Sequence, residues 1–134
     1  MIKVYDNFLP EYHFKQMQSV LLSEYMPWYH NEYIRDENQK GKYQFVHSFF
    51  GPHGYSLRYR DLEGTFNIIL QRLNAKQLYR IKANLNPRSF FNRTGGYHID
   101  GFNCQYTAIY YINTNNVFVF KILKVDFSIL FCAV

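Results

Sequence analysis

The stretch Gly95-Gly96-Tyr97-His98-Ile99-Asp100-Gly101, followed by Tyr106-Thr107-Ala108-Ile109-Tyr110-Tyr111-Ile112-Asn113, organises the rest of this sequence. The second half is rich in aromatic and β-branched residues, which is typical of a strand. Side chains two residues apart in an extended segment point to the same side. If the first half is extended, the imidazole of His98 and the carboxylate of Asp100 share one side, where they can hold a divalent metal.

A metal site of this kind needs further ligands. Non-haem Fe(II) oxygenases hold iron with two histidines and one carboxylate and leave the other positions open for substrate and oxygen. The two glycines before His98 allow a close approach, and Gly101 allows the backbone to turn away. A His-x-Asp pattern alone is weak evidence, because an exposed strand can carry both residues by chance. The sequence therefore predicts two metal ligands, His98 and Asp100, and does not identify a third.

Bulk composition indicates one folded domain, residues 1–134, with 48% hydrophobic and 19% charged residues. The net charge of +5 would suit a partner that carries phosphates. The basic residues are scattered among apolar ones and form no dense block, so an ordinary basic surface is favoured over a nucleic-acid interface. Nucleic acid is therefore a possible but not the favoured partner.

Cysteine usage and the ends of the sequence favour a cytoplasmic protein without a membrane partner. Cys104 and Cys132 are too few for a disulfide framework, and their spacing matches no zinc pattern. The N-terminus has no secretory signal. The apolar run 117–134 is short for a membrane span and is interrupted by three charged residues, Lys121, Lys124 and Asp126.

Apolar periodicity divides the chain into two helices and several strands. One helix is predicted from the Asp6-Asn7-Phe8-Leu9-Pro10 entry, with polar capping residues, to about Glu24, and a second from about Arg58 to Asn74. Strands are predicted at 2–5, 28–34, 43–49, 77–85 and 106–113, with a turn at 51–54. This order favours an α+β fold with a mainly antiparallel sheet that forms a sandwich or a rolled barrel.

The His98-Ile99-Asp100 segment and the predicted strand after it resemble the prolyl 4-hydroxylase-like branch of the Fe(II)/2-oxoglutarate dioxygenases. In that family an H-x-D pair is followed by a strand of the form T-x-I-x-Y-(L/I)-N, which here corresponds to His98-Ile99-Asp100 and Thr107–Asn113. The opening 4–10 is also similar to the family's entry into its first helix. The resemblance extends from about Ile2 to Asn116. It implies a double-stranded β-helix (jelly-roll or cupin-like) core, with the two helices of the N-terminal half packed on it.

The resemblance also implies roles for individual residues. His98 and Asp100 correspond to the first two ligands of Fe(II), and Tyr111 to a strand tyrosine that binds the carboxylate of 2-oxoglutarate in several members. With a complete site, 2-oxoglutarate and oxygen would yield succinate and carbon dioxide while an unactivated C–H bond is hydroxylated. Judged without the family, Tyr111 is equally well explained as a core aromatic.

Four further residues are weaker candidates around Tyr111. Thr107 and Ile109 share its parity and would line the same pocket. Asn84, on the preceding strand, is a candidate for a contact with the cosubstrate. Residues 77–85 alternate apolar side chains with Arg80, Lys82 and Asn84, which is the period of a half-buried strand. Lys82 has the right charge for a carboxylate but matches no motif.

The sequence departs from the family after Asn116. Family members continue with a glycine-containing turn and further strands that bring a distal histidine, then an Arg or Lys for the far carboxylate of 2-oxoglutarate. Here no histidine follows His98, and the tail 117–134 is apolar and contains no glycine. A truncated or frameshifted dioxygenase domain with incomplete C-terminal strands is therefore predicted. The coding DNA tests this, since a distal histidine and a basic residue missing from every frame would exclude a frameshift.

Other histidines and lysines of the chain are candidates for the third iron ligand and for the 2-oxoglutarate anchor. Residues that could approach the site in three dimensions, although no local pattern indicates it, are His13, His30, His47 and His53 as ligands and Lys121 or Lys124 as the carboxylate anchor. Two ligands alone hold iron too weakly for turnover, because affinity depends on ligand number and on supporting hydrogen bonds.

The expected function is thus an Fe(II)/2-oxoglutarate-dependent oxygenase of the hydroxylase type with impaired turnover, whose substrate is not identified. The cosubstrates are 2-oxoglutarate and oxygen. One alternative is a non-catalytic basic module that binds nucleic acid through exposed aromatic rings and through Arg58, Arg60, Arg88 and Arg93. The other alternative is an inactive remnant.

Overall fold

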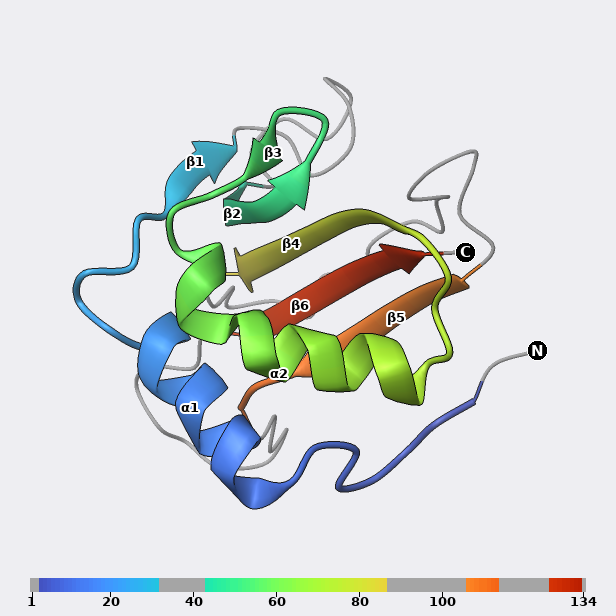
Figure 1. Cartoon of the computed structure of the whole chain (residues 1–134). Helices are drawn as coiled ribbons and strands as arrows, with labels where there is room; N and C mark the ends of the chain where they lie inside the picture. The colour runs from blue at the N-terminus through green and yellow to red at the C-terminus, as the bar shows by residue number, and fades with distance from the viewer. Residues whose placement is uncertain (1–2, 32–42, 87–105, 114–125, 134) are drawn as a thin grey trace.

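The computed structural model describes residues 3–31, 43–86, 106–113 and 126–133. Two helices, α1 (Glu11–Leu21) and α2 (Tyr59–Arg72), pack side by side on one face of an antiparallel sheet, as Figure 1 shows. The strands of the described residues form one six-stranded sheet: β1 (Tyr29–Asn31), β2 (Gln44–Gly51), β3 (Gly54–Tyr55), β4 (Leu78–Asn86), β5 (Tyr106–Tyr111) and β6 (Asp126–Ala133). The predicted α+β class and antiparallel sheet are confirmed.

The order of the strands in the sheet is β1-β2-β4-β6-β5, with β3 paired to β2. β6 therefore lies between β4 and β5, and it pairs with both in antiparallel register. The apolar tail, which the sequence marked only as atypical, thus contributes a central strand at 126–133. A short apolar run cannot be assigned to a strand or a helix by periodicity, which is why this strand was missed.

The N-terminal elements differ in detail from the prediction. Residues 3–5 are irregular and do not form the expected strand. The N-cap of α1 is Pro10, which makes no side-chain hydrogen bond, so neither of the polar capping candidates Asp6 and Asn7 caps the helix. Asn7 adopts a left-handed backbone with φ of 52°. The first backbone hydrogen bond runs from the Phe14 N–H to the Pro10 carbonyl at 3.1 Å. The helix ends at Leu21, three residues before the predicted end.

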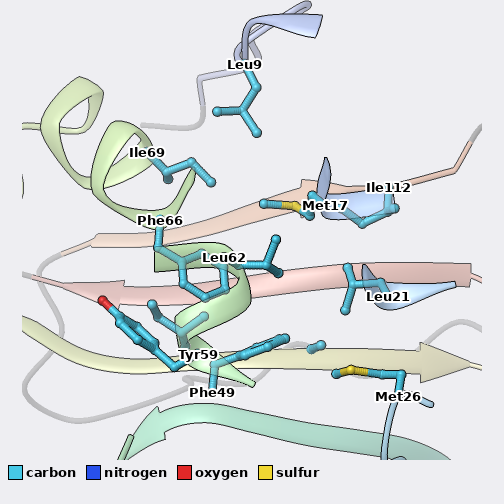
Figure 2. Close-up of a cluster of buried hydrophobic side chains, with 12 residues drawn as sticks. Leu9, Met17, Leu21, Met26, Phe49, Tyr59, Leu62, Phe66, Ile69 and Ile112 are labelled. Atoms are coloured by element: carbon cyan, nitrogen blue, oxygen red, sulfur yellow. The ribbon is translucent and has the colours of Figure 1, made fainter. Parts of the chain in front are cut away.

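The hydrophobic core lies between the helices and the sheet. Leu62, Phe66 and Ile69 form an apolar stripe along α2, and all three are almost fully buried. The ring of Phe66 meets that of Phe49 on β2 edge to face, with centroids 5.1 Å apart. Figure 2 shows this stripe together with Met17 and other buried side chains of the cluster. Each such side chain stabilises the fold by about 1.5–3 kcal/mol relative to an exposed one.

The β2–β3 hairpin confirms the predicted turn at 51–54. Gly51 pairs with Gly54, and Pro52 and His53 form the two-residue connection. Gly54 has a φ of +87°, a conformation that L residues rarely adopt. The pairing of β2 with β4 shifts register between Ser48 and Phe50, so Phe49 has no partner residue in β4. The ring of Phe49 is buried and packs against α2. The hairpin therefore completes the side of the core next to α2.

Candidate functional site

Alternation along β5 divides its side chains between two faces of the sheet. Tyr110 points to the helices, where its ring lies 6.4 Å from that of Phe14 and burial raises the pKa of its hydroxyl, only partly offset by a backbone hydrogen bond at Leu9. Thr107, Ile109 and Tyr111 point to the opposite face, where Ile109 is 53% and Tyr111 60% exposed. The predicted shared parity of these three residues is confirmed, and Tyr111 is not a core aromatic.

The same alternation holds in β4. Ile81 and Ala83 are fully buried beneath the helices, whereas Arg80, Lys82 and Asn84 alternate with them and are half-buried. We call the surface turned away from α1 and α2, made by Arg80, Lys82 and Asn84 of β4 and Thr107, Ile109 and Tyr111 of β5, the far face. Arg80 had no role in the sequence-based site, although its place in the alternating pattern put it on the same side of the strand as Asn84.

β6 lies between β4 and β5, and its pairing with both strands decides which of their residues lie opposite each other across it. Asn84 and Tyr111 both pair with Ser128 of β6, one from each side. One step along, Lys82 and Ile109 both pair with Leu130. Two strand spacings separate β4 from β5, or about 10 Å. Asn84 and Tyr111 are therefore level on the same face, one on either side of Ser128.

Asn84 carries an unsatisfied polar group on the far face. Its Oδ1 is buried and accepts no hydrogen bond within the part of the chain that the structure describes. A buried acceptor left without a donor costs about 1–3 kcal/mol. A ligand that offers a donor at the level of Asn84 and Tyr111 would remove this cost.

The predicted iron ligands His98 and Asp100 lie outside the described residues. In the described ranges, no group of three or more His, Cys, Asp or Glu side chains is placed to hold a metal ion. The predicted metal centre therefore depends on His98 and Asp100 themselves.

His47, one of the candidates for the third ligand, is buried and hydrogen-bonded inside the fold. It is 3% exposed and lies on the helix side of β2, where its ring contacts that of Phe49. Its Nδ1 is 2.8 Å from the Pro27 carbonyl oxygen and therefore carries the proton, and its Nε2 accepts from Ser56 Oγ at 3.1 Å. Burial lowers the pKa of the imidazole; the bond to Pro27 raises it, and the charge of Arg58 lowers it.

The other histidines of the described residues also lie away from the far face. His13 Nδ1 is 3.0 Å from Thr65 Oγ1, between α1 and α2. His30, in the short edge strand β1, stands against the rings of Tyr43 and Phe45. His53 is exposed in the β2–β3 turn. None of these positions brings an imidazole next to Tyr111.

The arginines proposed for nucleic-acid binding have different environments. Arg58 forms a 3.0 Å ion pair with Asp61 and donates to the Tyr25 carbonyl at 2.8 Å, so it fastens the start of α2 to the turn after α1. Arg60 is exposed on α2, and Arg88 and Arg93 lie outside the described residues. The charge of Arg58 is thus largely compensated within the fold.

Comparison with other proteins identifies no relative: no family model, curated protein or solved structure matches this chain. Neither helix of the described residues has the length and apolar composition needed to cross a bilayer. The chemistry of the far face is therefore the basis for a functional proposal.

Proposed function

We propose that the far face is the cosubstrate-binding surface of an Fe(II)/2-oxoglutarate-dependent oxygenase of the hydroxylase type, built on a double-stranded β-helix. The observation that carries the proposal is the common orientation of Thr107, Ile109 and Tyr111, with Asn84 level with Tyr111 across β6. These are the four residues that the resemblance assigns to the cosubstrate. The helices cover one face of the sheet, and polar side chains lie on the far face. This arrangement is consistent with a sheet that binds its ligand on the face opposite the helices.

Each residue has a distinct task in this proposal. The Tyr111 hydroxyl donates a hydrogen bond to a carboxylate of 2-oxoglutarate, and the Asn84 amide binds the same molecule from the β4 side. Ile109 places an aliphatic side chain, and Thr107 a hydroxyl group, on the same face as the ligand. His98 and Asp100 would hold Fe(II), which supplies oxygen activation when bound.

Turnover is impaired in this proposal because no third ligand is identified among the residues that the structure describes. His13 and His47 are hydrogen-bonded elsewhere in the fold, and no histidine follows His98 in the sequence. Metal affinity falls with the number of ligands and of the hydrogen bonds that orient them. The 134-residue chain therefore binds iron weakly and oxidises 2-oxoglutarate slowly or not at all.

An anaerobic titration tests the proposal. Fe(II) with saturating 2-oxoglutarate should produce a weak visible charge-transfer band that is lost in His98→Ala and kept in the control His53→Ala. Tyr111→Phe should weaken 2-oxoglutarate binding about tenfold, the effect of losing one hydrogen bond to a charged group. The absence of a band in the unmodified chain at saturating Fe(II) and 2-oxoglutarate would exclude the proposal. Steeply salt-dependent oligonucleotide binding without a band would instead favour the basic module.

A further inference from the structure

A serine and a histidine near the start of α2 form a hydrogen-bonded pair that the proposed function leaves unused. Ser56 Oγ lies 3.1 Å from Nε2 of His47, and Nδ1 of His47 lies 2.8 Å from the Pro27 carbonyl oxygen. We propose that this pair is an acyl-transfer site for small uncharged carboxylic esters, in which Ser56 is the nucleophile and His47 the general base. The site lies apart from the far face and needs no metal.

The first support is the protonation state of the His47 ring. A carbonyl oxygen only accepts hydrogen bonds, so the contact with Pro27 places the ring proton on Nδ1. Nε2 then carries the lone pair and accepts the hydroxyl proton of Ser56. Burial lowers the pKa of the imidazole despite the opposing bond to Pro27, so the ring is uncharged at neutral pH. A general base needs this state and this orientation toward a hydroxyl nucleophile.

The second support is the way in which the fold holds the two residues. Ser56 lies in the short connection from β3 to α2 (Figure 1). Its backbone N–H donates to the Phe49 carbonyl at 2.9 Å, and its carbonyl accepts from the Tyr59 N–H at 3.1 Å. His47 is 3% exposed on β2, with its ring against that of Phe49. Both members of the pair are therefore held in position before a substrate binds.

The third support is that the Ser56 hydroxyl has no role in capping the helix that follows. A serine just before a helix ordinarily accepts hydrogen bonds from the first N–H groups of the helix. The N-cap of α2 is Arg58, and this helix has no side-chain cap. The hydroxyl of Ser56 is instead directed to the imidazole of His47. Stabilisation of the helix end therefore does not explain this contact.

The fourth support is a hydrogen-bond donor next to the nucleophile. The backbone N–H of Leu57 donates no hydrogen bond within the part of the chain that the structure describes. Attack on an ester places a negative charge on the former carbonyl oxygen, and backbone N–H groups stabilise that charge. The N–H of the residue after a nucleophilic serine is a common donor of this kind. In the proposed site Leu57 provides it.

The surroundings of Ser56 favour an uncharged, apolar acyl group. Its two neighbours in sequence are apolar side chains that face solvent, since Tyr55 is 64% and Leu57 89% exposed. Tyr29, which is 61% exposed, stacks on the imidazole of the pair with centroids 6.1 Å apart. The guanidinium of Arg58 is already held by an ion pair and by a backbone carbonyl. This cation therefore does not select an anionic substrate.

The proposed reaction is balanced without a further reagent. Oγ of Ser56 attacks the ester carbonyl carbon while the hydroxyl proton moves to Nε2 of His47. The bond from this carbon to the alcohol oxygen then breaks, the alcohol leaves with that proton, and the acyl group stays on Ser56. A water molecule that gives its proton to His47 attacks the acyl group next. The carboxylic acid leaves, and the Ser56 hydroxyl is restored.

Labelling with diisopropyl fluorophosphate tests the nucleophile. The reagent forms an Oγ–P bond with an activated serine and loses fluoride, and peptide mass spectrometry locates the adduct. In the unmodified chain, Ser56 should be labelled at least about 100-fold faster than Ser48, which is the contribution typical of a general base. Ser48 is the internal reference, because it is exposed and its hydroxyl donates to the Phe50 carbonyl rather than to an imidazole. This comparison needs no variant, so it remains decisive if a substitution of the buried His47 prevents folding.

Hydrolysis of p-nitrophenyl acetate tests the acyl transfer. The unmodified chain should release several equivalents of p-nitrophenolate. Ser56→Ala and folded His47→Gln should each lower the rate by about 100-fold or more. Ser48→Ala is the matched control and should leave the rate unchanged. Circular dichroism shows whether each variant is folded.

Three results would overturn the proposed acyl-transfer site. The first is labelling of Ser56 that is no faster than that of Ser48. The second is the absence of p-nitrophenyl acetate turnover in the unmodified chain. The third is turnover that persists in Ser56→Ala. Each of them would leave the hydrogen bond between Ser56 and His47 as a structural contact only.

Discussion

The two faces of the sheet use the same strands for different purposes. On β4, Ile81 and Ala83 are fully buried beneath the helices, whereas Arg80 and Lys82 alternate with them on the far face. On the helix side, polar groups form hydrogen bonds within the fold. An example is the 2.9 Å bond from Gln18 Nε2 to the Ile112 carbonyl. On the far face, the Asn84 oxygen has no donor among the described residues. One face thus stabilises the fold, and the other is the face on which we propose that a ligand binds.

The sharpest test of this difference is a pair of identical substitutions. Ile81→Ala should lower the free energy of unfolding by about 2–5 kcal/mol, because a fully buried side chain loses its contacts and leaves a cavity. Ile109→Ala, on the far face, should cost less than about 1 kcal/mol, since Ile109 is 53% exposed. Urea unfolding measures both. Equal losses would contradict the division between the two faces.

A second pair tests the polar contacts of the helix side. Gln18→Ala should destabilise the chain by about 1–2 kcal/mol, because the carbonyl of the buried Ile112 loses its hydrogen bond. Gln71→Ala, at an exposed position of α2, is the control and should change stability by no more than about 0.5 kcal/mol. Thermal unfolding followed by circular dichroism compares the two. A Gln18 variant as stable as the control would show that this bond contributes nothing.

The pH dependence of stability should report on His47. Burial lowers the pKa of its imidazole in the folded chain below the ordinary value of 6.5, so the unfolded chain binds the proton more tightly. The stabilisation is therefore fully present above pH 6.5 and is lost as the pH falls towards the folded pKa. Urea unfolding from pH 8 to pH 5 should show this loss. His47→Gln should flatten that part of the profile, and an unchanged profile would assign the pH dependence to other groups.

The smallest expected effect lies on the outer side of the helix layer. Gly64 is exposed in the middle of α2, and a Cβ added there meets nothing within 4 Å. Gly64→Ala should therefore stabilise the chain by about 0.5–1 kcal/mol through helix propensity alone. The melting temperature measures this gain. A loss of stability would indicate that the outer side of α2 is covered in solution.

Local patterns predicted much of the fold because they are properties of short segments. The stripe Leu62, Phe66 and Ile69 recurs at helical spacing, and α2 begins one residue and ends two residues from the predicted bounds. Alternation likewise assigned Arg80 and Asn84 to one side of a strand. The cap of α1 was predicted wrongly, since Asp6 and Asn7 favour capping in general but the left-handed Asn7 leaves Pro10 at that position.

Sequence alone determined which side chains of β4 and β5 share a side, because the two-residue repeat of a strand is a local property. It also supplied the His98 and Asp100 pair, whose role stays a prediction. Only the tertiary structure decided that Asn84 and Tyr111 are level. That result depends on β6, a strand distant from β4 in sequence, pairing between the two strands in a single register. Long-range pairing of this kind is set by packing across the whole sheet, and no short segment encodes it.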